Sequence, residues 1–268
     1  MPLHFGCQGW NYPDWVGPFY PPGTRRDAFL RTYARAFSAV EIDATFYAIP
    51  PIDTVRRWAA QVPPGFLFCP KLPQAITHER RFRDVAAVQA AFFDTMRALG
   101  DRLGIVLCQC APDFAPDQFD AFAAWLPTLP RDVPVAVEFR HKGWITREVH
   151  QLCTDHGVAI ALSDGRWVPR GWLLKLAERP TAAFDYVRFM GPDRTLTRFD
   201  RTQRDMSEAL AAWTPALRTI AARAGGSVAC CNNHFAGHAP ATLRTLQSAL
   251  GQTPVAPASL ADQGSLFG

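Results

Sequence analysis

The sequence predicts an α/β fold, a single (β/α)8 TIM barrel, and three observations support this class. Eight short runs rich in β-branched and aromatic residues alternate with segments of helical period. Strict alternation requires parallel strands with right-handed crossovers, and eight such units favour closure into a barrel. The length of 268 residues suits one barrel of roughly 250 residues. We therefore expect a barrel domain at residues 1–250 and a mobile tail at residues 251–268.

The expected strands are short and are spaced evenly along the chain. Each is rich in apolar side chains and is bounded by polar or turn-forming residues. They cover residues 3–7, 39–43, 66–71, 104–109, 133–140, 158–164, 185–189 and 228–233.

The segments between the strands carry helix start and stop signals. An aspartate precedes three of the expected helices, and a glycine follows two. The longest helix, expected over residues 203–223, contains Pro215, which predicts a break or kink. The aspartates are Asp27, Asp53 and Asp84, and the glycines are Gly100 and Gly157.

The composition indicates a globular protein and restricts its partners. Lys and Arg number 28 against 24 Asp and Glu, and a net charge of +4 without long charged runs does not argue for a nucleic-acid coat or a membrane-surface protein. Seven cysteines, without a Cys-x-x-Cys pair, indicate a reduced chain. Neither a signal peptide nor a membrane-spanning stretch is visible, so we expect a cytoplasmic protein without a membrane partner.

Polar residues accumulate where the expected strands end, and this is where barrels build their active sites. The two-residue period of a strand predicts which of them face the interior. The period places Glu41, Glu138 and Arg140 inward. The full set of polar residues is Glu41 on the second strand, Lys71 at the end of the third, Glu138 and Arg140 on the fifth, Asp164 at the end of the sixth, Arg188 on the seventh, and Asn232 and Asn233 after the eighth.

Two interpretations of this cluster stay open. An ion pair between Glu138 and Arg140 would close the top of the barrel without any ligand. Alternatively, the three cations bind a phosphate or carboxylate, while the three carboxylates serve as catalytic acid and base or as ligands of a divalent metal. The histidines show no metal-ligand spacing, so the metal is the weaker hypothesis and the cofactor is unknown.

Aromatic residues flank the expected mouth of the barrel. The loop at residues 9–23 is long for a first strand-to-helix connection, and it either forms a lid or binding wall or packs on itself as a plug. Tyr47, after the second strand, would extend the same wall. We expect Trp10, Tyr47 and His78 to contribute to substrate binding.

Ordered motifs run through the chain up to about residue 250. They include Gly-Cys-Gln-Gly-Trp at residues 6–10, Glu-Ile-Asp-Ala-Thr-Phe-Tyr at 41–47, Lys-Leu-Pro at 71–73, Glu-Phe-Arg-His at 138–141, Tyr-Val-Arg-Phe at 186–189 and Asn-Asn-His at 232–234. With these motifs the sequence resembles the YecE-like family, bacterial and archaeal TIM-barrel proteins described as a domain of unknown function. The resemblance implies the barrel but no reaction, and the family's distant likeness to endonuclease-IV-type barrels implies DNA binding or phosphodiester cleavage only by analogy of fold.

The sequence departs from the usual pattern of that family near three strand ends. Gln8 stands where a serine is common, Asp43 where an asparagine is typical, and Met190 where a histidine is usual. Because all three lie near strand ends, these departures are compatible with a change in substrate detail.

The last six residues give an independent clue about a partner. Gln263, Leu266 and Phe267 resemble the Gln-x-Ser/Asp-Leu-Phe peptide with which bacterial DNA polymerases and repair proteins dock on the sliding clamp. An extended tail with a polar anchor and a Leu-Phe pair suits docking, because pockets take the side chains and a linker gives reach. The alternative is a tail folded back on its own barrel.

Three hypotheses for function remain. The first is an enzyme acting on a phosphate-containing substrate, nucleic acid included, such as a phosphoester or phosphodiester hydrolase. The second is a non-catalytic module that binds an anion and is recruited to DNA by its tail. The third is a sugar-processing enzyme, which aromatic walls and paired carboxylates favour without a motif of its own.

Overall fold

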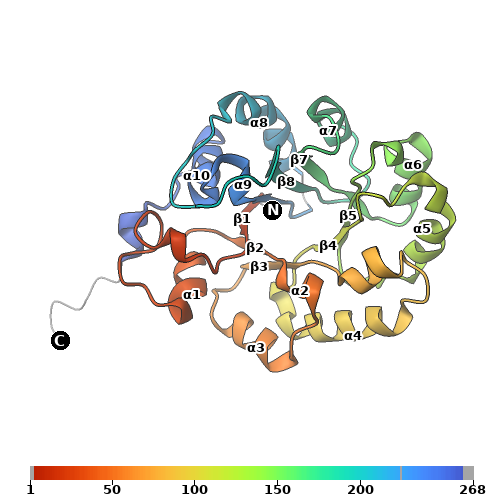
Figure 1. Ribbon diagram of the computed structural model, residues 1–268, viewed down its shortest axis with the longest axis horizontal. Coiled ribbons are helices and arrows are strands. Elements are labelled where there is room, and N and C mark those ends of the chain that lie inside the picture. The colour runs from red at the N-terminus through yellow and green to blue at the C-terminus, as the bar shows by residue number, and fades with distance from the viewer. Residues whose placement is uncertain (1–2, 224, 262–268) are drawn as a thin grey trace.

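The computed structural model describes residues 3–223 and 225–261. Its strands lie at the centre of the molecule with the helices around them (Figure 1). Paired strands are parallel throughout, in a six-stranded sheet of order β3-β2-β1-β9-β8-β7 and a three-stranded sheet of order β4-β5-β6. The predicted α/β class with parallel strands is confirmed.

Seven of the eight expected runs hold one strand each, and the sixth holds two. Its first half, β6, pairs with β5, and its second half, β7, pairs with β8, with Ala161 between them. The strands are β1 His4–Gln8, β2 Ala39–Ile42, β3 Leu67–Pro70, β4 Val106–Gln109, β5 Val135–Glu138, β6 Ala159–Ile160, β7 Leu162–Gly165, β8 Tyr186–Gly191 and β9 Val228–Cys231.

The described residues form two sheets rather than one continuous closed ladder. One interruption falls between β6 and β7. The other falls between β3 and β4, where isolated parallel bridges join Phe68 to Leu103 and Lys71 to Leu107. The expected eight-stranded closure is therefore not seen as continuous strand pairing.

The helices follow the strands in the expected alternation. Thr146 caps α6, because its Oγ1 accepts a hydrogen bond from the backbone N of Val149 at 3.2 Å. The long α8 continues across Pro215 without the predicted break. The helices are α1 Phe29–Tyr33, α2 Ala44–Tyr47, α3 Ile52–Ala60, α4 Ala86–Met96, α5 Phe119–Trp125, α6 Arg147–Asp155, α7 Arg170–Ala177, α8 Ser207–Ala221, α9 Asn233–Ala236 and α10 Ala239–Ala249.

Small and apolar side chains fill the space between the inner faces of the two sheets. Both sheets contribute to this cluster, and its members alternate along each strand with residues that face the helices. Two residues further along a strand, the inward positions become polar, which places the candidate site directly above this inner core. The cluster contains Ala39, Cys69, Ile105, Leu107, Ala136, Ala159, Ala161, Tyr186, Val228 and Cys230.

The aromatic loop at residues 9–23 belongs to the outer core. Trp15 and Tyr20 are fully buried, and the ring of Tyr20 stacks on Phe29 of α1 with centroids 4.4 Å apart. Trp15 lies parallel to Tyr33 of the same helix. Of the two interpretations of this loop, the structure shows the self-packed one.

Part of the segment expected to be a mobile tail packs on the body of the protein. Residues Pro257–Leu260 form a short helical turn, Leu260 is buried, and Arg35 donates a hydrogen bond to the carbonyl of Leu260 at 2.9 Å. Because this segment has little hydrophobic periodicity, the sequence did not predict the apolar contact of Leu260. The predicted docking residues Gln263, Leu266 and Phe267 lie outside the described residues.

Two further features of the structure concern the state of the cysteines and the apolar character of the helices. All seven cysteines are buried and free of disulfides. In the described part of the chain, no helix has the length and apolar character needed to cross a membrane.

Candidate functional site

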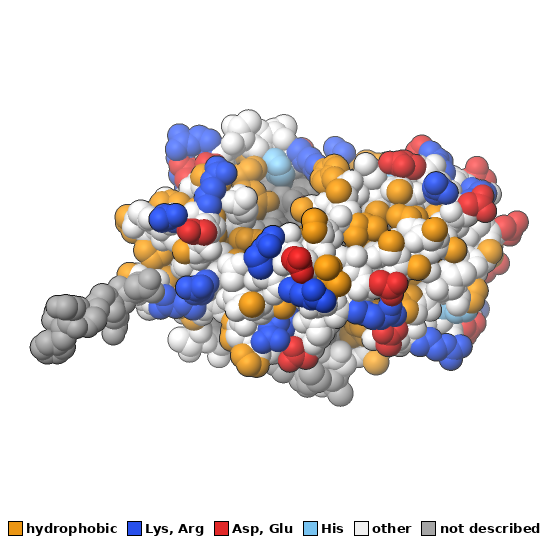
Figure 2. Space-filling view, turned by 90° about the horizontal axis from the view of Figure 1, so that it is seen from below, with side chains coloured by type: hydrophobic (Ala, Val, Ile, Leu, Met, Phe, Trp, Pro, Cys, Tyr) orange, Lys and Arg blue, Asp and Glu red, His pale blue; other side chains and the backbone are white. Residues whose placement is uncertain are grey.

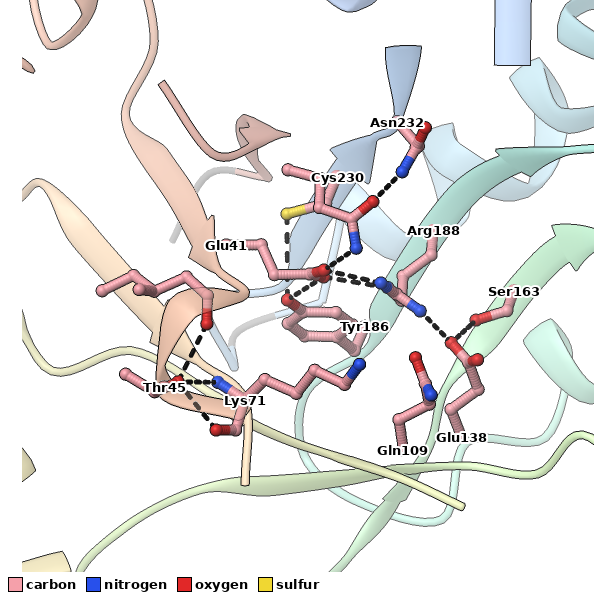
Figure 3. A network of polar contacts seen from close by, with 12 residues as sticks. Glu41, Thr45, Lys71, Gln109, Glu138, Ser163, Tyr186, Arg188, Cys230 and Asn232 are labelled. Carbon is pink, nitrogen blue, oxygen red and sulfur yellow. Dashed lines mark hydrogen bonds and ion pairs between the residues drawn. The ribbon is translucent and has the colours of Figure 1, made fainter. Parts of the chain in front are cut away.

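Three charged side chains meet between the carboxyl ends of strands from both sheets (Figure 3). Glu41 comes from β2, Glu138 from β5 and Arg188 from β8, and each has 1% or less of its surface exposed. Each of the three lies two residues further along its strand than an inward-facing member of the apolar cluster, so each faces the interior as well. The sequence therefore predicted correctly that these residues share the interior.

Arg188 is the centre of this cluster. Its Nε and Nη2 atoms form a fork on the Glu41 carboxylate at 2.8 and 2.6 Å, and its Nη1 atom donates to Glu138. Glu41 also accepts hydrogen bonds from Tyr186 at 2.9 Å and from Gln8 at 2.7 Å. A fork of this kind is among the strongest charge-assisted contacts in proteins.

Glu138 extends the network to a second arginine. Its carboxylate accepts from Arg140 Nε at 2.9 Å and from Ser163 Oγ at 2.5 Å, and Arg140 also donates to Gln109 at 2.6 Å. Burial alone would raise the pKa of Glu138, but the charges of Arg188 and Arg140 outweigh it and hold the pKa well below its usual range.

Two of the three carboxylates predicted to act as acid or base, Glu41 and Glu138, form ion pairs in this network. Glu41 and Glu138 are both held in ion pairs with arginines, so they are poorly suited to exchange protons with a substrate. Arg188 is neutralised by two carboxylates and does not offer a free cation to an anion. For Glu138 and Arg140, the ion-pair interpretation fits the geometry.

Lys71 differs from its charged neighbours because its amine has no hydrogen-bond or ion-pair partner among the described residues. The residue is 7% exposed, and Nζ makes no hydrogen bond or ion pair with any described residue. Figure 3 shows the side chain extending from the end of β3 toward Gln109 and Glu138. Burial lowers the pKa of Lys71 to about 8; the charge of Asp43 opposes this shift and that of Arg188 adds to it.

Local structure after β2 and β3 holds Lys71 in place. The hydroxyl of Thr45, on α2, accepts a hydrogen bond from the backbone N of Lys71 at 3.0 Å. The next residue, Phe46, places its ring 3.8 Å from Nζ. Asp43 precedes this helix; its Oδ1 atom is enclosed without a hydrogen-bond partner among the described residues, and burial followed by the charge of Glu41 raises its pKa.

His78 faces the same group of residues. It lies on a π-helical turn, Ala75–Glu79, and its ring packs edge-on against Phe46. Such wide turns occur often at functional sites. Burial, together with the charges of Lys71 and Arg140, lowers the pKa of His78 to about 4, so the ring is neutral at pH 7.

A basic pocket of about 210 Å³ opens beside Glu138. The register of β7 against β8 shifts between Asp164 and Gly165. Such an irregularity changes the direction in which the following side chains point. Both carboxylates in the lining are already paired, Glu138 with Arg188 and Asp193 with Arg204. The ionisable and aromatic lining consists of Glu138, Arg140, Arg166, Trp167, Asp193 and Arg194.

Two arginines of this pocket are free to bind a ligand. Arg166 and Arg194 are exposed and form no ion pair within the described part of the chain, and Arg166 lies over the ring of Trp167 at 4.4 Å. A larger groove of about 740 Å³ lies between α4 and α5. That groove is on the outer surface, away from the strand ends, and contains none of the predicted site residues.

Asp164 does not join the cluster. Its Oδ2 atom accepts hydrogen bonds from Trp213 on α8 at 2.7 Å and from Arg170 on α7 at 2.8 Å, so the carboxylate faces the helices. The inward residue of β7 is Ser163, which contacts Glu138. The alternation of Ala159, Ala161 and Ser163 could have shown this phase.

The asparagines after β9 have separate positions. Asn232 donates to Gln8 and caps α9 by accepting from the backbone N of His234 at 2.7 Å, so it borders the site. Asn233 instead accepts from the indole of Trp15 at 3.2 Å beneath the aromatic loop.

The two predicted aromatic contacts also lie apart from the charged cluster. Trp10 packs edge-on against Trp58 of α3, at a centroid distance of 5.7 Å. Tyr47 is 72% exposed and touches Phe46. Neither ring contacts the arginines of the pocket.

Residues that sequence reasoning did not assign to the site complete it. Gln8 bridges Glu41 and Asn232, Asp43 lies near Lys71, and Met190 lines the basic pocket. These are the three departures from the family pattern, so that pattern was the available signal. Arg166 and Arg194 lie in loops, where no periodicity marks orientation. In the described residues, no three His, Cys, Asp or Glu side chains are grouped so that they could hold a metal ion.

The fold and site define a class: a parallel α/β protein with a buried ion-pair network and a free lysine at the carboxyl ends of its strands. The chain belongs to the family described as "Protein of unknown function DUF72", whose model matches residues 4–263.

Curated relatives resemble the chain in sequence, and solved structures resemble it in fold. The chain is 29% identical over 210 residues to the UPF0759 protein YecE of Escherichia coli, covering 71% of this chain and 75% of that protein. It is 26% identical over 208 residues to the UPF0759 protein YunF of Bacillus subtilis, covering 74% and 69%. A crystal structure of a DUF72 family protein from Thermotoga maritima matches with a TM-score of 0.77 and 23% identity, covering 94% of this chain and all of that one. A second, from Enterococcus faecalis, gives 0.71 and 19%, covering 94% and 99%.

Proposed function

We propose that this protein is an enzyme that acts on a small phosphate-bearing molecule at the carboxyl ends of its strands. The observation that carries the proposal is the basic pocket, in which Arg166 and Arg194 have no carboxylate partner among the described residues. A planar guanidinium group can bind a phosphate through two parallel hydrogen bonds to two of its oxygens. In this proposal the phosphate lies against these two arginines and Arg140.

The proposal includes a (β/α)8 barrel as the scaffold. The two sheets contain all the strands in chain order, only Ala161 separates β6 from β7, and bridges connect β3 with β4. The inner apolar cluster draws on both sheets. These features support one barrel whose ladder is locally irregular, with its active site at the usual end.

Lys71 is the group that we expect to react. The carboxylates of Glu41 and Glu138 are held as ion-pair partners, whereas the lysine amine is free and its pKa of about 8 is close to neutral pH. A group of that pKa exchanges protons efficiently near pH 7. The paired carboxylates then serve to fix the arginines, and the reaction with the substrate falls to Lys71.

The size of the pocket favours a small ligand over a nucleic acid, and one side of the molecule shows no basic track. The volume of about 210 Å³ is below the roughly 300–1,000 Å³ of pockets for drug-sized ligands. On the face drawn in Figure 2, basic and acidic side chains are interspersed rather than gathered into a basic track. Binding to a nucleic-acid backbone would favour such a track.

A screen for turnover tests the proposal. The purified chain is incubated with phosphorylated trioses and pentoses, nucleoside monophosphates and single-stranded oligonucleotides, with and without Mg²⁺, Mn²⁺ or Zn²⁺, and products are followed by NMR and phosphate release. We expect turnover of a small phosphorylated compound, a KM raised about tenfold or more in R166A/R194A, and loss of kcat in K71M.

Two exposed arginines provide a matched control for charge. Arg131 precedes β5 and Arg179 follows α7, at the opposite ends of the strands. R131A/R179A should keep the wild-type KM. Turnover of oligonucleotides alone, no turnover of any compound, or equal kinetics in the wild type and R166A/R194A would contradict the proposal.

A further inference from the structure

Lys71 is chemically unusual within this chain. The sequence has three lysines, at positions 71, 142 and 175, among its 28 basic residues. Lys142 and Lys175 are exposed, whereas Lys71 is buried. Arginine keeps its proton under physiological conditions, but a buried lysine can lose its proton and become a nucleophile. The interior therefore holds one amine among guanidinium groups.

The surroundings of this amine favour its neutral form. Nζ has no hydrogen-bond acceptor among the described residues, and the Arg188 guanidinium adds a second positive charge nearby. The Phe46 ring at 3.8 Å and the charges of Asp43, Glu41 and Glu138 favour the ammonium form, but burial has the largest effect and the pKa is lowered to about 8. The charged or titratable groups that face Lys71 are Glu41 and Asp43 from β2 and its end, His78 from the π-helical turn, Glu138 and Arg140 from β5 and its end, and Arg188 from β8.

We infer that the Lys71 amine forms a Schiff base with the carbonyl carbon of an aldehyde or ketone. A desolvated lysine beside another cation is the usual arrangement for this chemistry. The inference deepens the proposed function and rests on it for the phosphate, since the substrate class becomes a small phosphorylated carbonyl compound. The phosphate would lie against Arg140, Arg166 and Arg194, and the carbonyl group would reach Lys71.

The step balances without an oxidant or reductant. The nitrogen lone pair of the neutral amine forms a bond to the carbonyl carbon as the carbon–oxygen π bond opens, and the first of the two amine protons passes to the oxygen to give a carbinolamine. The carbon–oxygen bond then breaks, the oxygen leaves as water with the two protons of the amine, and a carbon–nitrogen double bond remains.

Asp43 is placed to move these protons. Its effect on the pKa of Lys71 is the largest of any carboxylate, and its Oδ1 atom is enclosed without a partner in the described part of the chain. Burial raises the pKa of Asp43, so more of it carries the proton that the leaving oxygen needs than an ordinary aspartate would.

Reductive trapping tests the inference on the full chain. The protein is incubated separately with glyceraldehyde 3-phosphate and with glyceraldehyde, reduced with sodium borohydride, digested, and analysed by peptide mass spectrometry. A trapped lysine gains the mass of the carbonyl compound minus one oxygen atom. With glyceraldehyde 3-phosphate we expect the fraction of Lys71 labelled to exceed that of Lys142 and Lys175 by about tenfold, although those two are exposed. Labelling of Lys142 and Lys175 with Lys71 unlabelled would overturn the inference.

The two probes separate this inference from the proposed function. Preferential labelling of Lys71 by the phosphorylated probe, lost in R166A/R194A, supports both. Equal labelling of Lys71 by both probes keeps the Schiff base and removes the phosphate pocket. Binding of glyceraldehyde 3-phosphate measured by calorimetry, with Lys71 unlabelled, keeps the pocket and removes the Schiff base.

The pH profile and one variant test the environment of the amine. Labelling of Lys71 should rise with pH and level off above about 8, which is below the pH at which an ordinary lysine amine reaches its full reactivity. D43N should lower the labelling of Lys71 at pH 7 without changing that of Lys142, in protein whose circular dichroism is unchanged. Parallel profiles for Lys71 and Lys142 would show an ordinary amine, and unchanged labelling in D43N would remove the role of Asp43.

Discussion

Arg188 on β8 donates a hydrogen bond to Glu138 on β5, and this ion pair joins the two sheets across the interior. The same guanidinium holds Glu41 on β2. The network therefore connects strands that have no backbone pairing with one another. Its first role is to fix the carboxyl ends of the strands at which Lys71 and the basic pocket lie.

Removal of Arg188 should lower the free energy of unfolding. R188M leaves two buried carboxylates without their shared cation, and breaking a buried pair in this way costs about 3–5 kcal/mol. Urea denaturation measures the change in the free energy of unfolding. R194A, which removes an exposed arginine, should change it by no more than about 0.5 kcal/mol. Equal stability of R188M and R194A would contradict this account of the network.

The network should also make the free energy of unfolding depend on pH in the acidic range. Because the pKa of Glu138 in the folded protein lies below the 4.5 of an ordinary glutamate, its ionisation stabilises the fold above that pH. This contribution is lost as the pH falls from 4.5 toward the lower, folded value. We expect the free energy of unfolding to fall over this range in the wild type and to fall less steeply in E138Q. Parallel curves for the two proteins would mean that Glu138 is not held by its arginines.

Lys71 should reduce stability rather than add to it. A pKa lowered from 10.5 to about 8 corresponds to a destabilisation on the order of 3 kcal/mol at neutral pH. K71M keeps an unbranched apolar stem without the charge, so we expect it to raise the free energy of unfolding at pH 7. In the wild type, stability should rise between pH 8 and 10.5, because only the unfolded chain still binds the proton.

K142M provides the control for this measurement. Lys142 is exposed, and its replacement should leave stability unchanged. Destabilisation of the fold by K71M would show that Lys71 is a structural residue. Stabilisation with loss of activity is the pattern expected of a functional residue.

The docking peptide at residues 263–268 remains a proposal from sequence. Deletion of these residues should abolish binding of the full chain to a purified bacterial sliding clamp, measured by surface plasmon resonance. Replacement of Leu266 and Phe267 by alanine should have the same effect, because the pair would fill the pocket of the partner. The absence of binding by the full chain at micromolar concentration would end this hypothesis.

Strand positions and most inward-facing residues could be predicted because alternation is a local property. Glu41, Glu138 and Arg188 each lie two positions beyond a small or apolar inward residue of the same strand. Asp164 was misassigned because the end of the strand was given more weight than its phase. Its partners, Trp213 and Arg170, lie on helices and were not visible from the strand itself.

Which charges remain free could not be predicted from sequence. Lys71 and Arg188 were expected to act alike as anion-binding cations, yet Arg188 is neutralised and Lys71 is unpartnered. The difference depends on distances between side chains from separate strands. Arg166 and Arg194 were not assigned for a related reason, since loop residues have no period from which their direction can be inferred.

Isothermal titration calorimetry with glycerol 3-phosphate tests the central claim most directly, with glycerol as the uncharged comparison. The wild type should bind glycerol 3-phosphate but not glycerol, and R166A/R194A should bind it at least about tenfold more weakly, a loss of roughly 1.4 kcal/mol. R131A/R179A should bind like the wild type. No binding at millimolar concentration, or the same Kd in R166A/R194A as in the wild type, would contradict the assignment of the basic pocket as a phosphate site.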